Sequence, residues 1–597
     1  MCGIVGIADF NRPLTEDLLL AMRDRLEHRG PDDAGAFLTP DASVALGMRR
    51  LAILDLSPKG HQPMTTPDGR FTIVYNGEIY NYVELRAELE RQEVPFTSDS
   101  DTEVLLHAYA AWGAKALDRL CGMFAFAIWD REERTLFLAR DRVGKKPLLY
   151  YWDGQRFAFA SEMKALLALP ECAPRLDPEA VDVYFALGYI PAPLSIFRQV
   201  RKLPPGHYLK LADGQLQVTR YWFPECSDVR PASTREGRLE EFRALFEEAV
   251  RIRLRSDVPI GLFLSGGVDS SAVAAECVRQ GCSLRAFTVA FDQDQTDLPF
   301  ARQAAAHLGL EQEVIAASGQ DLAADLARIV WYYDEPFADT SSVPSYYIAQ
   351  ATQGRFKVIL NGDGGDEAFA GYRHYEEIAR KQFLKSLAAA AGLKDGRFGQ
   401  PWQVYFQSKS LLRRRERQEL LGAAHSTGDS LGRLLEAEPF LQGYKAPDAL
   451  HLALWGDRHL YLAHDLLYKM DIALMAHSIE GRSPFLDHRL LEWAQRLPSE
   501  DLAQGRAKKV LLRAALRGVL PTEILDRPKY GFGAPVVRWL EGPLQPLLAE
   551  YLPTPLLEGE AQARLLRALP QGKAAEYERI WALLTFAVWA QVWRATW

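Results

Sequence analysis

Short apolar segments separated by turn residues dominate the first 210 positions of the chain. Apolar runs bounded by turn residues predict strands, here at 71–75, 124–129, 135–139, 147–151 and 157–160. Apolar residues recur with helical spacing at 14–26, 82–91 and 101–112. This mixture of strands and helices predicts an α+β domain in which sheets pack on helices.

The pattern changes after residues 224–237, which are polar, contain prolines and lack periodicity, as expected of a linker. The chain then alternates between predicted helices at 240–253 and 270–280 and predicted strands at 259–264 and 284–291. Alternating strands and helices predict a parallel, doubly wound α/β sheet. From about residue 370 the pattern is mostly helical, and the apolar run 580–590 indicates a buried helix. We therefore place a first domain at 2–210, a linker region at 211–237 and a second domain at 238–597.

Composition and charge mainly exclude functions. The 597 residues are 48% apolar and 25% charged, which is typical of a soluble multidomain protein. A net charge of −8 gives no indication of nucleic-acid or anionic-membrane partners. The basic stretch 409–418 falls in a helical pattern and favours a solvated helix face, with anion binding as the alternative.

The cysteines and the chain start indicate a cellular location. The six cysteines form no paired CxxC spacing, which argues against a zinc site or a disulfide framework and for a reducing compartment. Arg12 and Pro13 interrupt the start of the chain, so it does not resemble a signal peptide. The longest apolar run is far below the roughly 20 residues that span a bilayer. We expect a cytoplasmic protein.

Cys2 follows the initiator Met directly. If the Met is removed, this residue carries a thiol, whose thiolate is a nucleophile, and an α-amine that can act as its base. The alternative is a buried cysteine beside the apolar strand 4–8. Polar motifs at wide spacing favour the first interpretation, and they lie at 28–32, 49–53, 75–81, 100–101 and 144–148.

Together with the opening MCGIVG, these motifs resemble class II glutamine amidotransferase domains over about residues 2–210. The resemblance implies the αββα sandwich of N-terminal-nucleophile enzymes, with Asn76 and Gly77 forming the oxyanion hole. It also implies that Arg50 holds the α-carboxylate of L-glutamine through a bidentate fork. Glu78 and Asp101 would hold the α-ammonium group of the same substrate.

The segment 262–271 (LFLSGGVDSS) follows an apolar strand and opens a helix. Glycines let the backbone approach a ligand closely, serines donate hydroxyl groups, and a helix N-terminus attracts an anion. The lysine of a Walker A loop is absent, so the loop suits pyrophosphate as a leaving group better than γ-phosphoryl transfer. The alternative is a plain glycine-rich turn from strand to helix.

SGGVDS matches the signature of ATP pyrophosphatases, and with the amidotransferase half it makes the whole chain resemble glutamine-dependent asparagine synthetases. Further matching motifs lie at 334–341, 361–367, 371–372, 480–487, 508–513 and 527–533. The resemblance implies ATP-binding positions at Leu264, Ser265, Gly266, Gly267, Asp269, Ser270, Val289, Asn361 and Gly362.

The resemblance also implies roles around the phosphates and the acceptor. Lys509 would stabilise charge on the phosphates during adenylation, and the alternative is a solvent-facing helix lysine. Asp269 and Asp366 would ligate Mg²⁺, a cation that prefers oxygen donors. Asp366 would also lie near the acceptor, and Arg482 would form either an acceptor contact or a structural salt bridge.

Two departures from the best-known asparagine synthetases concern the acceptor rather than the reaction. Their SGEGSDE loop reads NGDGGDE here, so Asn361 replaces a nucleotide-contacting Ser. Asp363 stands where a Glu is thought to deprotonate ammonia, and it keeps the carboxylate on a shorter side chain. Pro344 stands where those enzymes place an Arg.

We therefore expect an ATP-dependent carbon–nitrogen ligase that converts L-aspartate, ATP, L-glutamine and water into L-asparagine, AMP, diphosphate and L-glutamate. Exclusion of water from the acyl-adenylate favours a closed cleft and an internal ammonia channel. The synthetase site is expected to lie wholly after the linker.

Two alternatives stay open. One is the same chemistry on a cell-wall, sugar or secondary-metabolite acid, and the other is a non-catalytic scaffold homologue. Intact Cys2, SGGVDS and Lys509 argue against a scaffold. Intact Cys2 also argues against a lactam-forming relative, because such enzymes can dispense with the N-terminal cysteine. The sequence leaves a homodimer open.

Overall fold

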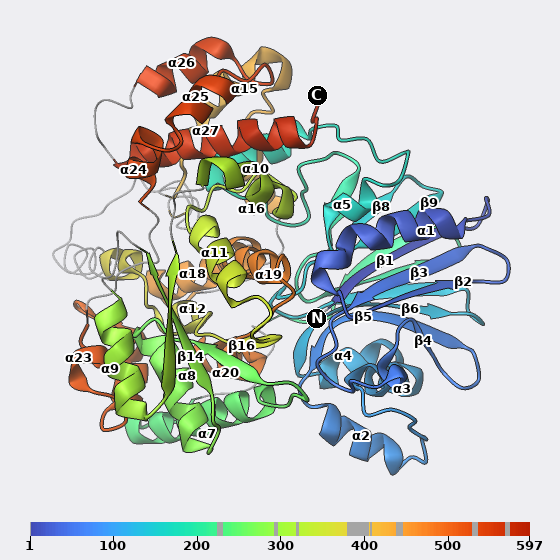
Figure 1. Cartoon of the computed structure of the whole chain (residues 1–597), viewed down its shortest axis with the longest axis horizontal. Helices are drawn as coiled ribbons and strands as arrows, with labels where there is room; N and C mark the ends of the chain where they lie inside the picture. The colour runs from blue at the N-terminus through green and yellow to red at the C-terminus, as the bar shows by residue number, and fades with distance from the viewer. Residues whose placement is uncertain are drawn as a thin grey trace.

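The computed structural model describes most of the chain (Figure 1). The described residues are 2–223, 231–291, 297–317, 322–378, 405, 409–437, 446–527, 535–567 and 574–597. Residues 224–230 of the predicted linker and 528–533 of the last motif lie outside them.

Two six-stranded antiparallel sheets form the first domain. One sheet has the order β10-β8-β9-β1-β3-β2 and the other β12-β11-β7-β6-β5-β4. The strands of the first sheet are β1 (Cys2–Asp9), β2 (Asp33–Leu38), β3 (Val44–Arg50), β8 (Leu149–Trp152), β9 (Arg156–Ala160) and β10 (Val200–Lys202). Those of the second are β4 (Met64–Thr65), β5 (Phe71–Ile79), β6 (Gly122–Asp130), β7 (Thr135–Arg140), β11 (His207–Ala212) and β12 (Gln215–Arg220).

The first domain has four layers, with two sheets in the middle and helices on both outer faces, because side chains alternate between the two faces of each sheet. Ile4 of β1 packs with Val74 of β5 in a core between the two sheets, because neighbouring residues of a strand point to opposite faces. Val5 points the other way and packs with Leu19 of helix α1 (Glu16–Arg23). Ile73 contacts the core formed by α2 (Tyr82–Glu90) and α3 (Asp101–Trp112) on the outer face of the second sheet. The predicted αββα sandwich is confirmed.

The boundaries of several predicted elements differ from those observed. The helix expected at 14–26 ends at Arg23 and continues as a 3-10 helix over Asp24–Arg29. The domain boundary expected at 210 lies inside β11, since this strand pairs with both β7 and β12. The expected linker region 211–237 therefore includes β12, and it also includes the start of α7 (Arg235–Arg253), which Thr234 caps.

A five-stranded parallel sheet forms the centre of the second domain, in the order β15-β14-β13-β16-β17. Its strands are β13 (Ile260–Phe263), β14 (Arg285–Phe291), β15 (Glu311–Ala317), β16 (Val358–Leu360) and β17 (Glu480–Arg482). The chain moves from β13 outward to β14 and β15, and then returns to β16 on the other side of β13. In such sheets ligands bind where the strand order reverses, at the carboxyl ends of the strands. The predicted doubly wound sheet is confirmed.

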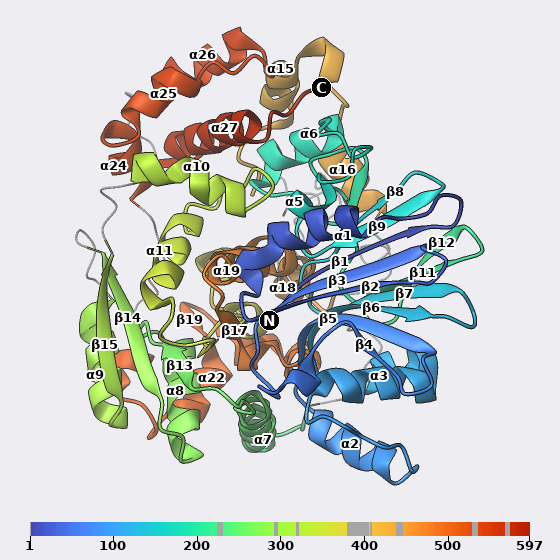
Figure 2. The ribbon, with the colours of Figure 1, turned by 45° about the vertical axis from the view of Figure 1, so that its right-hand side comes forward.

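Helices surround this sheet and form the C-terminal part of the chain, as predicted (Figure 1). Helix α8 (Val268–Arg279) follows β13, and α19 (Leu467–Met475) lies near the centre of the molecule, between the two domains (Figure 2). The long helix α27 (Ala574–Val592) is buried over the predicted run 580–590. None of the described helices is long and apolar enough to cross a bilayer.

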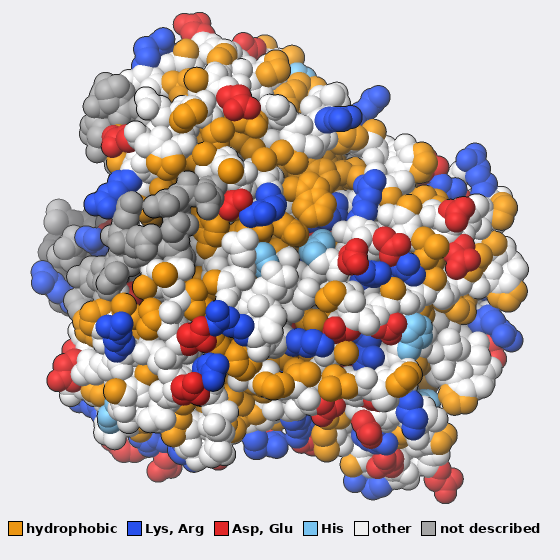
Figure 3. Space-filling model, viewed as in Figure 1, with side chains coloured by type: hydrophobic (Ala, Val, Ile, Leu, Met, Phe, Trp, Pro, Cys, Tyr) orange, Lys and Arg blue, Asp and Glu red, His pale blue; other side chains and the backbone are white. Residues whose placement is uncertain are grey.

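The C-terminal helices pack on the first domain as well as on the second. The hydroxyl group of Tyr184, on α6 (Pro178–Leu187), donates to the carbonyl of Ala582 at 2.8 Å. Within the basic stretch 409–418 a helix begins only at Arg414, and Arg417 is buried in an ion pair with Asp182 of α6. A solvated face therefore does not describe this whole stretch. Acidic and basic side chains are interspersed over the face of the molecule in Figure 3.

Candidate active sites

Cys2 begins the central strand of the first sheet and is buried. Its backbone N–H donates to Oδ1 of Asn76 at 3.0 Å, which joins the start of β1 to β5 of the facing sheet. Nδ2 of Asn76 is buried and has no hydrogen-bond partner among the described residues. A buried amide donor without a partner, on a side chain bonded to the backbone of Cys2, is suited to an oxyanion that forms during reaction.

Gly77 follows Asn76 where β5 and β6 are in close contact. A Cβ at this position would lie 2.2 Å from the carbonyl oxygen of Met123, so only glycine fits without moving the strands. Burial raises the pKa of the Cys2 thiol, while the Leu51 N–H and the positive charge of Arg50 oppose this shift. The thiol therefore needs a base close by to become a thiolate.

Arg50 ends β3 directly opposite Cys2 in the register of the sheet. Its Nη2 atom donates to the carbonyl oxygens of Leu54 at 3.1 Å and Asp55 at 2.7 Å. A Cβ at Gly60 would lie 2.0 Å from this nitrogen, so the loop closes tightly over the guanidinium. The predicted ligand of the glutamine carboxylate is thus held in place opposite Cys2.

Two buried carboxylates lie in the same region. Asp101 accepts hydrogen bonds from the hydroxyl of Tyr75 and the N–H of Ile79, both at 2.9 Å, and burial raises its pKa to about 6. Glu78 is 3.2 Å from Nη2 of Arg482, and burial raises the pKa of Glu78 although Arg482 opposes the shift. The charge of Asp101 also raises the pKa of Glu78, so the two acidic groups predicted to bind an ammonium ion lie close to each other.

Arg482 requires a correction. Its side chain is completely buried, pairs with Glu480 at 2.6 Å and donates to the carbonyl oxygens of Arg253 and Arg255. It does not line the cavity of the second domain. Of the two predicted roles, the structural salt bridge agrees with the structure and the acceptor contact does not, because the guanidinium forms an ion pair that joins β17 to Glu78 of the first domain.

A cavity of about 720 Å³ opens at the point where the strand order of the parallel sheet reverses. The predicted residues that line it are Leu264, Ser265, Gly267, Asp269, Ser270, Val289, Asn361, Gly362, Asp363, Asp366 and Lys509. Leu187 and Gly188 of the first domain also line it. The expectation that the synthetase site lies wholly after the linker is therefore wrong.

The SGGVDS loop has the compact geometry of an anion-binding turn. Gly266 has a positive φ of 70° and would clash with the backbone of Ala301 if it carried a Cβ. The hydroxyls of Ser265 and Ser270 lie 3.0 Å apart. A Cβ at Gly362 would lie 2.8 Å from the backbone nitrogen of Ser270, so the loops after β13 and β16 touch.

Lys509, from a third segment of the chain, contacts both the loop after β13 and the loop after β16. It immediately precedes helix α22 (Val510–Leu516), with a positive φ of 54°. Its ammonium group contacts Asp269 and lies 2.7 Å from Asp366. Both carboxylates raise the pKa of Lys509 against the opposing effect of burial. Because only 5% of Lys509 is exposed, the alternative of a solvent-facing helix lysine is wrong.

The residues expected to hold Mg²⁺ fit that ion. Asp269 and Asp366 present carboxylates to the cavity on either side of Lys509, and hard divalent cations prefer such oxygen donors. A second group of potential ligands among the described residues is Cys121, Asp487 and His488. Asp487 there is paired with Arg253 and Arg489, and the group does not line the cavity.

Asp363 lines the cavity and lies close to a lysine of the first domain. Its Oδ2 atom accepts a hydrogen bond from the Asn361 amide at 2.6 Å and lies 3.9 Å from Nζ of Lys145. Burial raises the pKa of Asp363, while Lys145 and Lys469 oppose the shift. The carboxylate is thus placed to accept a proton inside the cavity.

Several charged residues that line the same cavity were not predicted from the sequence. Lys469 on α19 bonds Asp339 at 2.5 Å and Ser341 at 2.7 Å, and Asp465 lies one helical turn earlier. The motif 334–341 marks Asp339 and Ser341. No local signal marks Lys469, because its place in the cavity results from the packing of α19.

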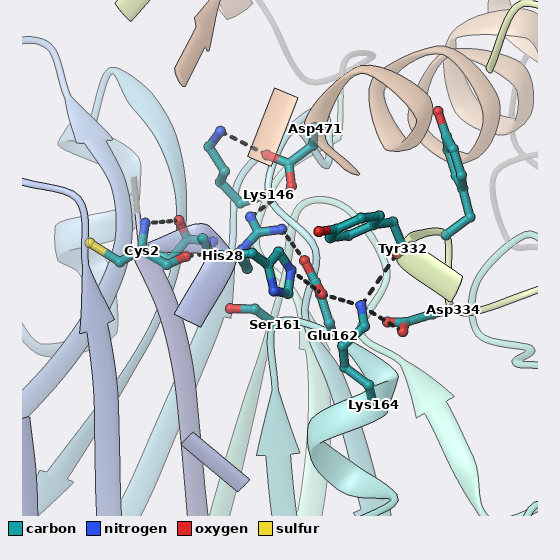
Figure 4. Close-up of polar contacts among 12 residues, drawn as sticks. Cys2, His28, Lys146, Ser161, Glu162, Lys164, Tyr332, Asp334 and Asp471 are labelled. Carbon is teal, nitrogen blue, oxygen red and sulfur yellow. Dashed lines mark hydrogen bonds and ion pairs between the residues drawn. The ribbon is translucent and has the colours of Figure 1, made fainter. Parts of the chain in front are cut away.

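A buried set of charges joins the Cys2 site to α19 (Figure 4). Arg29 donates to the carbonyl of Cys2 at 3.1 Å, and it pairs with Glu162 at 2.6 Å and Asp471 at 2.7 Å. Lys146 pairs with the other oxygen of Asp471 at 3.1 Å. Since Asp471 is two residues from Lys469 on α19, one helix contacts both sites.

Family comparisons agree with this two-site arrangement. Residues 1–222 match the model of the glutamine amidotransferase domain, and residues 241–591 match the model of asparagine synthase. The chain belongs to the asparagine synthase family and carries an N-terminal glutamine amidotransferase domain.

The similar proteins include enzymes with different names. Asparagine synthetase (glutamine-hydrolyzing) 1 of Bacillus subtilis is 34% identical over 99% of this chain and 97% of its own length. Asparagine synthetase (glutamine-hydrolyzing) 3 of the same species is 33% identical over 89% of this chain and 86% of its own. Amidase chry2 of Gibberella zeae is 28% identical over 88% of this chain and 86% of its own.

Proposed function

We propose that the chain transfers the amide nitrogen of L-glutamine to L-aspartate, which it activates with ATP as an acyl-adenylate. The observation that carries the proposal is the cavity in which Asp269, Asp366 and Lys509 meet beside the SGGVDS loop, next to a domain that holds Cys2. The loop suits diphosphate release, and the cysteine suits attack on an amide.

In the first domain, the Cys2 thiolate attacks the side-chain amide carbon of glutamine. Once Met1 is removed, the α-amine of Cys2 takes the thiol proton and passes it to the leaving nitrogen, which departs as ammonia. Asn76 Nδ2 and the Gly77 N–H stabilise the oxyanion, and water then hydrolyses the glutamyl thioester. Arg50 binds the α-carboxylate, while Glu78 and Asp101 bind the α-ammonium group.

In the second domain, an acceptor carboxylate oxygen attacks the α-phosphorus of ATP and expels diphosphate. Lys509 stabilises the charge that develops on the phosphates, and the backbone at Leu264, Val289 and Gly362 contacts the adenosine. Mg²⁺, when held by Asp269 and Asp366, would neutralise phosphate charge. Asp363 takes a proton from the nitrogen as ammonia attacks the acyl carbon and AMP leaves.

L-Aspartate as the acceptor is supported by the names of the similar bacterial proteins. A different carboxylate is favoured by Asp363 and Pro344, which stand where the best-known asparagine synthetases have Glu and Arg. A relative named as an amidase is compatible with that second candidate.

The test is an amidation assay of the purified chain with ATP, Mg²⁺, glutamine and a panel of carboxylic acids, read by mass spectrometry. Asparagine, AMP and diphosphate in equal amounts are the expected products. Amidation of another acid, without asparagine, would replace the acceptor and keep the reaction type. ADP and phosphate as products would overturn the adenylation mechanism.

A further inference from the structure

The turn between β7 and β8 carries a lysine of the first domain to the cavity of the second. Asp141 fixes this turn, because its carboxylate accepts hydrogen bonds from the backbone N–H groups of Val143, Lys145 and Lys146. Gly144 has the positive φ of 73° that the turn requires. The two lysines then reach different partners, since Lys146 pairs with Asp471 and Lys145 faces Asp363.

Lys145 is 3% exposed and begins a chain of hydrogen bonds that ends at Asp363. Its ammonium group donates to the hydroxyl of Ser483 at 3.2 Å, and Ser483 donates to Oδ1 of Asn361 at 2.5 Å. The Asn361 amide donates to Asp363 at 2.6 Å. In each of these hydrogen bonds the donor lies on the Lys145 side and the acceptor on the Asp363 side. Hydrogen bonds aligned in this way strengthen one another.

We propose that Lys145 is a positioning residue by which the glutamine amidotransferase domain completes the ammonia-accepting site of the synthetase domain. The lysine acts through Asp363, both by the charge 3.9 Å away and by the bonded chain through Ser483 and Asn361. The inference rests on the proposed role of Asp363 as the proton acceptor.

Burial explains why this arrangement favours an ionised Asp363. A buried carboxylate tends to hold its proton, and a neighbouring cation counteracts that tendency. The charged groups that act on Asp363 are Lys145 from the first domain, Lys469 from α19 and Asp366 from its own loop. Lys145 is the one of these that reaches it from the amidotransferase domain.

The test compares Lys145→Met, Lys145→Arg and Asp363→Asn in the full-length chain with saturating ammonium chloride as the nitrogen donor. Lys145→Met should lower the kcat of amide formation by roughly 10²-fold, the order expected when a reacting group is misplaced by about 1 Å. Acceptor-dependent ATP–diphosphate exchange and glutaminase activity should stay near wild type. Lys145→Arg should recover most of the loss, and Lys115→Met, at an exposed lysine of the same domain, is the matched control.

A double variant separates positioning from simple domain docking. If Lys145 acts through Asp363, adding Lys145→Met to Asp363→Asn should cause no further loss, because coupled residues are not additive. If Lys145 only docks the domains, Lys145→Met should be normal with saturating ammonia and impaired only with glutamine, which would overturn the inference. Ser483→Ala keeps the charge of Lys145 but breaks the chain of hydrogen bonds, so it should lower the kcat of amide formation less than Lys145→Met does. This variant also tests the inference if Lys145→Met does not fold.

The single variants also distinguish this inference from the proposed function. Normal amidation by Asp363→Asn would refute the proton-acceptor role itself. Loss of amidation in Asp363→Asn together with normal amidation in Lys145→Met would refute only the role of Lys145.

Discussion

Arg29 of the amidotransferase domain forms a 2.7 Å ion pair with Asp471 of helix α19, and both side chains are buried. The same guanidinium donates to the carbonyl oxygen of Cys2. The backbone of Cys2 is therefore connected to the synthetase domain by a single side chain.

Asp471→Asn should destabilise the protein strongly. The change leaves Lys146 without its buried carboxylate and leaves Arg29 with Glu162 alone, and removing one partner of a buried pair costs about 3–5 kcal/mol. Urea unfolding measures the loss. Glu90→Gln, which breaks an exposed pair with Arg86 on α2, should cost no more than about 0.5 kcal/mol. Equal effects of the two variants would contradict a special role of the buried pair.

Cys2→Ala should abolish synthesis with glutamine and retain synthesis with ammonia. The thiol is the proposed nucleophile for glutamine alone, while external ammonia can reach the acyl-adenylate without it. Product formation with each nitrogen donor is the measurement. Cys172→Ala, at another buried cysteine of the same domain, should leave both activities intact. Loss of the ammonia-dependent reaction in folded Cys2→Ala would contradict the two-site scheme.

Asn76→Ala should reduce glutaminase kcat by roughly 10²–10³-fold, because it removes one donor to the oxyanion. The KM for glutamine should change much less, since Arg50, Glu78 and Asp101 are the proposed binding groups. Steady-state glutaminase kinetics give both values. A rise in KM at constant kcat would show that Asn76 binds the ground state and not the oxyanion.

Asp269→Asn should prevent formation of AMP and diphosphate and leave glutaminase activity measurable. The substitution keeps the size of the side chain but removes a charge that faces Lys509 and fits Mg²⁺. Diphosphate release is the measurement. Glu276→Gln, at the other end of helix α8 in an ion pair with Arg279, serves as the control. Normal adenylation by Asp269→Asn would exclude this carboxylate from the phosphate site.

Asp101 should make stability depend on pH. Its pKa in the folded protein is about 6, against ~3.9 in an unfolded chain, so folding favours the protonated form. The associated stability is complete below about pH 4 and is lost as pH rises through about 6. Asp101→Asn cannot titrate, so its thermal stability relative to wild type should rise over this interval. A constant difference in Tm between pH 4 and 7 would contradict the raised pKa.

The same titration should be visible in glutamine binding. Only the ionised carboxylate attracts the α-ammonium group, so the KM of the wild type should fall as pH rises through about 6. Asp101→Asn should have a higher KM without this step. Glutaminase assays across the pH range provide the comparison.

Candidate residues that lie together in one sequence motif could be found from the sequence, while residues brought to the cavity by long-range packing could not. Asn76 and Gly77 are adjacent on one strand, and the SGGVDS loop carries its glycines and serines in one segment. Lys469 enters the cavity only because α19 packs between the domains. The sequence could not decide between an acceptor contact and a structural salt bridge for Arg482, because its partner Glu78 lies about 400 positions earlier in the chain.

The hydrophobic pattern predicted an α+β domain before the linker and a parallel α/β sheet after it, while the αββα layering was implied only by the family resemblance. The boundaries were less predictable, since they depend on pairing across the sheet. Strand β12 lacks an apolar run of its own and is defined by its hydrogen bonds to β11. Likewise the sequence pattern places Arg417 on a solvated helix face, but in the structure Arg417 is buried in an ion pair with Asp182.

The buried charges around Asp471 also bear on how such chains can be recombined. A foreign amidotransferase half without counterparts of Arg29 and Lys146 would leave Asp471 buried and unneutralised, a strong penalty against the wrong match. A chimaera cut at the linker should therefore assemble poorly unless these three residues come from the same parent. Although the linker separates the two domains in sequence, the domains cannot be exchanged independently between homologous chains.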